Sequence, residues 1–281
     1  MKTIHKISLI LLIAVTAFSC TERIDIELDE SYTRLVVEGY MTTDANQNYV
    51  RLTKTTSYFY NEQPPAVTGA TVIVSDGDTS WQLSEQANGI YRFDPPVAGE
   101  IGKTYELNIT LNEALNDQTG YTASSKINPI NEIDSIAVAF RNNWNFWEVK
   151  CYAQDPPTTE FYMFRILKNG MMVTDSIDEV MVVDDVLYNG SYTNGIGVGW
   201  LDETRADERL RIGDTVEVLM SSITESYTSF IWNLQQEAGY QNPLFGGPPA
   251  NVPGNISNGA LGFFAAYSNT RASTIVNVSK D

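Results

Sequence analysis

The chain has 281 residues and a formal net charge of −17, with 35 acidic and 18 basic side chains, and 43% of its residues are hydrophobic. A surface this acidic repels phosphate backbones, which argues against a nucleic-acid partner. The length and the hydrophobic content suffice for one large or two moderate domains with packed cores.

Residues 1–19 have the pattern of a lipoprotein signal peptide. Lys2 and Lys6 give a positive start, and the apolar run 7–18 is shorter than the about 20 residues that a membrane-spanning helix needs. Small residues and then Cys20 follow this run. We therefore expect Cys20 to be lipidated and to anchor the protein in a membrane; a plain secreted protein is the alternative.

Removal of residues 1–19 takes away two lysines and the single histidine, His5, so the net charge becomes −19. Without histidine, Ser-His-Asp and Cys-His catalysis and the usual zinc sites are excluded, and we expect no cofactor. Carboxylate-pair hydrolysis and oxygen-ligated calcium stay open. Cys151 alternates with polar neighbours, so we expect it to be buried on the core face of a strand.

Residues 20–32 are expected to form an acidic tether. Ile24, Ile26 and Leu28 alternate with acidic residues there, so an edge strand is the alternative. Residues 33–128 are then expected to form an Ig-like or transthyretin-like β-sandwich, because short apolar stretches are punctuated by turn dipeptides about every ten residues. Strands are expected at 35–41, 49–53, 70–75, 81–83, 90–93 and 105–111.

Residues 129–281 are expected to form a second β-rich domain that begins after a joint at 128–132. One helix is expected over 222–239, because Ser222 and Glu225 form a capping box and Gly239 is a natural stop. Strands are expected at 133–140, 147–153, 160–167, 180–183, 197–201, 214–220, 262–267 and 274–278. The fold class is therefore mainly β with one α-helix.

The segment 239–258 holds four prolines and four glycines, and loops of this length tend to be functional. Its apolar residues favour an ordered loop on the sheet, so it is a candidate contact surface. Covering one end of the second sheet is the alternative. The candidate contact residues are Asn242, Pro243, Phe245, Pro248, Pro249, Asn251 and Asn255.

The chain resembles two groups of proteins. Segments 69–72, 89–91 and 102–107 are similar to transthyretin-like and carboxypeptidase-regulatory sandwiches, which implies a scaffold. A family of Bacteroidetes surface lipoproteins, known only as a domain of unknown function, resembles the chain at the Ser19-Cys20 pair, at Asp134 and at segments 36–40, 69–72, 89–91, 242–245, 248–251 and 255–264. This second resemblance implies an outer-membrane lipoprotein on the periplasmic or surface face. It also implies a TonB-dependent receptor as partner and no catalytic residues.

The predicted function is therefore a non-catalytic accessory of an outer-membrane receptor. The alternatives are a carboxylate-based glycosidase and a glycan-binding module that acts through Trp144 and Trp147. Core packing of these aromatic residues competes with the glycan-binding hypothesis. The acidic pairs at Asp76 and Asp78 and at Asp184 and Asp185 could bind calcium, but a hairpin turn and a solvated loop are the simpler interpretations.

Overall fold

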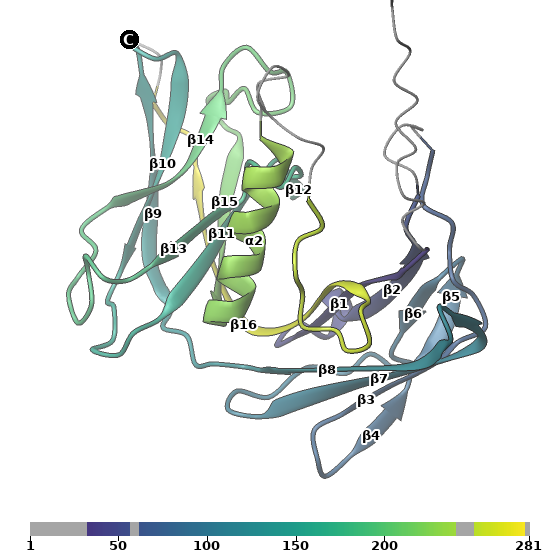
Figure 1. Cartoon of the computed structure of the whole chain (residues 1–281). Coiled ribbons are helices and arrows are strands. Elements are labelled where there is room, and N and C mark those ends of the chain that lie inside the picture. The colour runs from purple at the N-terminus through teal and green to yellow at the C-terminus, as the bar shows by residue number, and fades with distance from the viewer. Residues whose placement is uncertain (1–32, 57–61, 240–249, 279–281) are drawn as a thin grey trace, which may run out of the picture. The chain divides into compact units, whose positions relative to one another are not determined.

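The computed structural model describes residues 33–56, 62–239 and 250–278 (Figure 1). This part of the chain is mainly β with one α-helix, as predicted, and it contains no helix long and apolar enough to cross a membrane. Cys20 and the predicted tether lie outside the described residues. The elements are β1 (Leu35–Thr42), the short 3-10 helix η1 (Ala45–Gln47), β2 (Tyr49–Lys54), β3 (Thr71–Ser75), β4 (Ser80–Gln82), β5 (Ser84–Ala87), β6 (Ile90–Arg92), β7 (Thr104–Leu115), β8 (Gln118–Lys126), β9 (Ile133–Arg141), β10 (Phe146–Ala153), β11 (Phe161–Lys168), β12 (Met171–Met172), β13 (Met181–Asp184), β14 (Ile196–Asp202), β15 (Thr215–Ile223), α2 (Glu225–Ala238) and β16 (Leu261–Ile275).

A central sheet runs in the order β12-β11-β15-β16-β1-β2-β6-β5, with β13 paired to β11. Its key strand is β16, which pairs in parallel with β1 through its first half and antiparallel with β15 through its second half. The predicted strand 262–267 and the first two residues of the predicted strand 274–278 therefore belong to one strand, which ends at Ile275. The polar residues between them made them look separate, but their backbone groups continue the pairing with β15.

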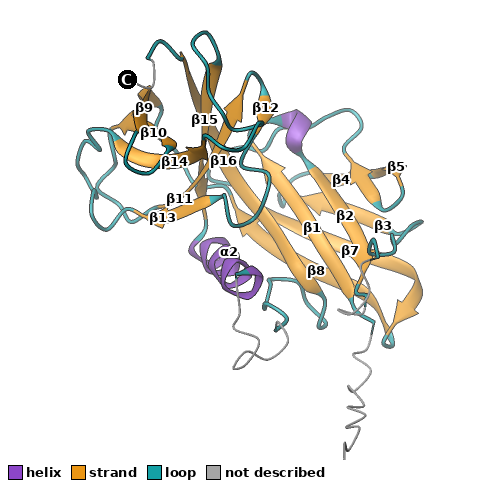
Figure 2. Cartoon of the chain, turned by 90° about the horizontal axis from the view of Figure 1, so that it is seen from above, coloured by secondary structure: helices purple, strands orange, loops and turns teal. Residues whose placement is uncertain are grey.

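Two smaller sheets cover one face of the central sheet at its opposite ends (Figure 2). The sheet β4-β3-β7-β8 encloses the first hydrophobic core, to which alternate β7 residues Tyr105, Leu107 and Ile109 contribute. This pattern follows from the period of two that places successive strand side chains on opposite faces. The sandwich predicted for this half is thus present, with part of the central sheet as its second layer.

The sheet β14-β10-β9 encloses the second core. Trp147, Val149 and Cys151 of β10 point into it, which confirms the predicted burial of Cys151. Burial raises the pKa of the Cys151 thiol to about 12, so the thiol stays protonated at neutral pH.

The predicted joint at 128–132 falls between β8 and β9, where one covering sheet gives way to the other. The central sheet extends across this boundary. Phe264 and Ala266 of β16 belong to the first core, while Ala272 of the same strand packs against the second. Residues from Thr33 onward form one compact unit. The boundary therefore separates the two covering sheets and not the shared sheet.

The helix α2 packs on the other face of the central sheet, through Tyr227 and Ile231 against Phe263 and Tyr267. It ends at Gly239, as predicted, but it begins later than expected. Its N-cap is Thr224, whose hydroxyl accepts a hydrogen bond from the Tyr227 N–H at 3.2 Å. Ser222 is instead buried in β15, because sheet pairing on both sides of it outweighs the local capping pattern.

Candidate functional site

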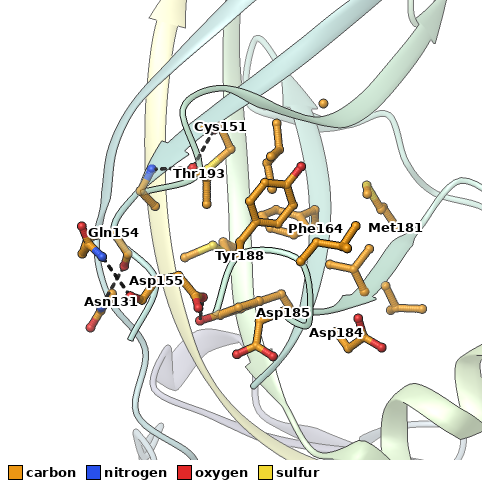
Figure 3. A pocket seen from close by; sticks show the side chains of 18 of the residues that line it. Asn131, Cys151, Gln154, Asp155, Phe164, Met181, Asp184, Asp185, Tyr188 and Thr193 are labelled. Carbon is orange, nitrogen blue, oxygen red and sulfur yellow. Dashed lines mark hydrogen bonds between the residues drawn. The ribbon is translucent and has the colours of Figure 1, made fainter. Parts of the chain in front are cut away.

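A cavity of about 400 Å³ opens between the second covering sheet and β11 and β13 (Figure 3). Cys151, Phe164 and Met181 give it apolar walls. The segment 185–195, which connects β13 and β14, passes along it and contributes Tyr188 and Thr193. An apolar cavity with a few convergent polar groups is the usual form of a small-ligand site.

Carboxylates gather at one end of this cavity. Oxygens of Asp155, Glu160 and Asp185 lie within 4.8 Å of one another. Asp155 and Asp185 are only 5% and 2% exposed, and Glu160 is half-buried. The register of β11 and β13 explains part of this gathering, because Phe161 pairs with Asp184 and so brings the adjacent Glu160 and Asp185 together.

Backbone and side-chain hydrogen bonds hold this acidic cluster in place. Asp155 accepts from the Tyr162 hydroxyl at 3.0 Å and from the Gly190 N–H at 3.2 Å. Asp185 accepts from the Glu160 N–H at 2.9 Å. Burial raises the pKa of both Asp155 and Glu160, and the nearby carboxylates add to the shift, because an ionised group is poorly solvated there.

A second feature is an exposed aromatic groove of about 460 Å³ on the outer face of β9, β10 and β14. The rings of Trp144 and Phe146 are stacked, with centroids 5.7 Å apart and planes 6° from parallel. Trp144 is 71% exposed and Trp200 is 52% exposed. Between these aromatic residues, Arg141 donates from Nε to the Glu148 carboxylate at 2.7 Å.

The aromatic residues around Trp144 and Trp147 lie in two different environments. Trp144 and Phe146 lie in the groove, but Trp147 does not. It is 1% exposed in the second core, and its indole N–H donates to Glu203 at 2.8 Å. Strand alternation turns Phe146 and Glu148 outward and Trp147 inward, so the core-packing interpretation is correct for Trp147.

Trp200 was not among the predicted site residues. It is the register partner of Glu148 across β10 and β14, which places it in the groove. Alternation along β14 does not predict its exposure, because Val198, two positions earlier, is buried and the register between β10 and β14 shifts at this point. The position of Trp200 comes from the pairing of β14 with β10, which is not local.

Most of the predicted contact loop is outside the described residues, namely Asn242, Pro243, Phe245, Pro248 and Pro249. Asn251 is exposed. Asn255 fastens the segment to β16, because its amide accepts from the Phe264 N–H at 2.9 Å and donates to the Phe264 carbonyl at 2.8 Å. Val252 and Ile256 are buried, as expected for an ordered segment.

The two acidic pairs that were candidate calcium ligands, Asp76 with Asp78 and Asp184 with Asp185, have different surroundings. Asp76 forms the predicted hairpin turn: its side chain accepts from the Thr79 N–H at 2.8 Å and pairs with Lys103, and these bonds lower its pKa to about 2. Asp184 is exposed, as expected, but it is the last residue of β13 and pairs with Phe161, so it does not lie in a loop. For Asp185 the solvated-loop interpretation is wrong, because the β11–β13 pairing draws it into the acidic cluster.

The fold and these features define a mainly β, sandwich-like protein with a cavity and an aromatic groove at one end. The chain belongs to the family described as a domain of unknown function (DUF4249), whose model matches residues 21–273. This confirms the predicted membership of a family without an assigned function.

No curated protein matches the chain. One solved structure in the comparison is that of a provisionally assigned carbohydrate-binding protein from Bacteroides uniformis ATCC 8492. It is 9% identical and has a TM-score of 0.22, and the match covers 86% of this chain and 98% of that one. A likeness this low carries no argument about function.

Proposed function

We propose that this protein is a non-catalytic, lipid-anchored glycan-binding protein whose aromatic groove holds the sugar. The observation that carries the proposal is the aromatic surface of Trp144, whose exposed ring is stacked parallel to the half-buried ring of Phe146, with Trp200 exposed in the same groove. Exposed aromatic rings are unfavourable in water, and a bound partner that covers them removes this cost.

The chemistry of the groove suits a carbohydrate. The C–H face of a sugar ring stacks on a flat aromatic ring, while its hydroxyl groups need hydrogen-bonding side chains around it. The groove is lined by the amides of Asn142 and Asn143 and by the Arg141–Glu148 pair. It therefore combines a flat apolar platform with polar groups at its rim.

The same groove is poorly suited to hydrolysis. Glycosidases use two carboxyl groups on either side of the scissile bond. Among the described residues that line the groove, Glu148 is the one carboxylate, and Arg141 is paired with it. These observations favour binding over the glycosidase alternative.

Affinity gel electrophoresis with a panel of soluble polysaccharides tests the proposal. The wild-type protein is expected to be retarded by at least one of them, and Trp144→Ala and Trp200→Ala are each expected to weaken that binding about tenfold or more, which corresponds to about 1.4 kcal/mol. Trp232→Ala is the matched control, since Trp232 is partly exposed on α2 and lines the cavity instead of the groove.

Two results would contradict the proposal. One is the absence of retardation on every polysaccharide. The other is an equal loss of binding in Trp232→Ala, which would indicate that the ligand binds in the cavity. Release of reducing ends during the same incubation would favour the glycosidase alternative.

The membrane context is also a proposal. Lipidation of Cys20 would hold the groove near the outer membrane, and the family resemblance supports a role as the accessory of a TonB-dependent receptor. In that arrangement the protein would capture a glycan and present it to the receptor.

A further inference from the structure

In the part of the chain that the structure describes, no basic side chain compensates the charge of the acidic cluster of Asp155, Glu160 and Asp185. Among the residues that the structure describes, no lysine or arginine forms an ion pair with any of the three. Carboxylates this close and this buried repel one another strongly, because little water screens them. The cluster therefore needs a partner that supplies positive charge.

Two oxygens of the cluster also lack a hydrogen-bond donor. Oδ1 of Asp185 and Oε2 of Glu160 are buried and have no partner in the described part of the chain. Asp185 is 98% buried, since only 2% of its surface is exposed, and its other oxygen is already bonded to the Glu160 N–H. A buried acceptor without a donor is destabilising, and more so when it is charged. Such orphan oxygens are what a bound cation would use.

The donor set selects the kind of cation. All three side chains offer oxygen, and the chain has no histidine among its described residues. Cys151 lines the same cavity, but its thiol stays protonated and so is a poor ligand. Calcium takes six to eight oxygen ligands in a flexible geometry, whereas zinc and copper prefer nitrogen or sulfur. Water in the adjoining cavity could complete the coordination.

We propose that Asp155, Glu160 and Asp185 form a calcium site that fastens segment 185–195 to the turn between β10 and β11. The segment already contacts this turn, because Gly190 donates to the Asp155 carboxylate and the Asp155 N–H donates to the Ser191 carbonyl at 3.0 Å. A cation bound by Asp155 and Asp185 joins both sides of the contact. Calcium thereby closes one end of the cavity shown in Figure 3.

Titration of CaCl2 into the full-length protein after chelator treatment tests this site. Isothermal calorimetry is expected to show one calcium ion per chain, with weaker binding of MgCl2, and calcium is expected to raise the Tm. Asp185→Asn and Glu160→Gln are each expected to weaken calcium binding at least tenfold. Asp184→Asn is the matched control: Asp184 is adjacent but exposed, and its loss is expected to leave binding unchanged.

Folding of the variants is checked by their own thermal transitions without calcium. Asp185→Asn removes a repelling charge, so its Tm in chelator is expected to equal or exceed that of the wild type. Three results would overturn the proposal: no calcium binding by the wild type, tighter binding of magnesium than of calcium, or calcium binding that survives both Asp185→Asn and Glu160→Gln.

Discussion

Trp144 and Trp147 lie three positions apart and have opposite surroundings. Trp144 follows the end of β9 and precedes Asn145, whose positive φ of 56° forms the tight turn into β10. Trp147 comes after the turn, on the inward side of β10. A single turn residue therefore separates a surface aromatic residue from a core one.

This contrast makes a prediction about stability. Trp147→Phe removes part of a fully buried side chain and takes one donor from the buried Glu203, so the free energy of unfolding is expected to fall by about 2–4 kcal/mol. Trp144→Ala is expected to change it by no more than about 0.5 kcal/mol, because its ring is mostly in solvent. Urea denaturation measures both, and equal losses would refute the assignment of the two residues.

At the scale of elements, the start of α2 shows how tertiary pairing and local capping compete. Ser222 and Glu225 have capping-box spacing, yet the backbone of Ser222 is used by β15. The chain leaves the sheet only after Ile223, and Thr224 is the first residue beyond the strand, with the extended backbone of an N-cap. The cap therefore falls on the next hydroxyl residue that the sheet releases.

The two hydroxyl residues are expected to differ when they are truncated. Thr224→Ala removes the bond to the Tyr227 N–H and is expected to lower the free energy of unfolding by about 1 kcal/mol. Ser222→Ala is expected to cost less than about 0.5 kcal/mol or to stabilise the protein, because the Ser222 hydroxyl is buried without a hydrogen-bond partner. Guanidinium denaturation of both variants provides the comparison. A larger loss of unfolding free energy in Ser222→Ala than in Thr224→Ala would indicate that Ser222 is the cap.

At the scale of the whole molecule, β16 couples the two cores. It depends on close backbone approach at Gly262, which has a φ of +91° and where a Cβ would lie 1.9 Å from the Val37 carbonyl oxygen. No other residue fits this position, because both the conformation and the contact require glycine. The pairing of β16 with β1 therefore depends on glycine at this position.

Gly262→Ala is accordingly expected to destabilise both cores together, by about 3 kcal/mol or more. Hydrogen exchange is expected to show β7 and β10 losing protection by the same amount, since the molecule unfolds as one cooperative unit. Gly213→Ala is the control: Gly213 has a similar φ of +95° but no atom within 4 Å of the added Cβ, so its cost is backbone strain alone. Loss of protection in β7 only would show that the two halves unfold separately.

What the sequence determined by itself is local in origin. Alternation with a period of two predicted the strands and the burial of Cys151, and the apolar stripe with Gly239 predicted α2 and its end. These features depend on the backbone geometry of a residue and its near neighbours. The local sequence determines that geometry directly. The family assignment followed from residues quoted along the same chain.

What only the tertiary structure decided depends on register between distant segments. The insertion of β16 between β1 and β15, the meeting of Trp200 with Glu148, and the gathering of Asp155, Glu160 and Asp185 all join residues far apart in the chain. No local period encodes such a pairing, because it is selected by the packing of whole sheets. The same packing buried Ser222, where the local pattern alone allowed a helix cap.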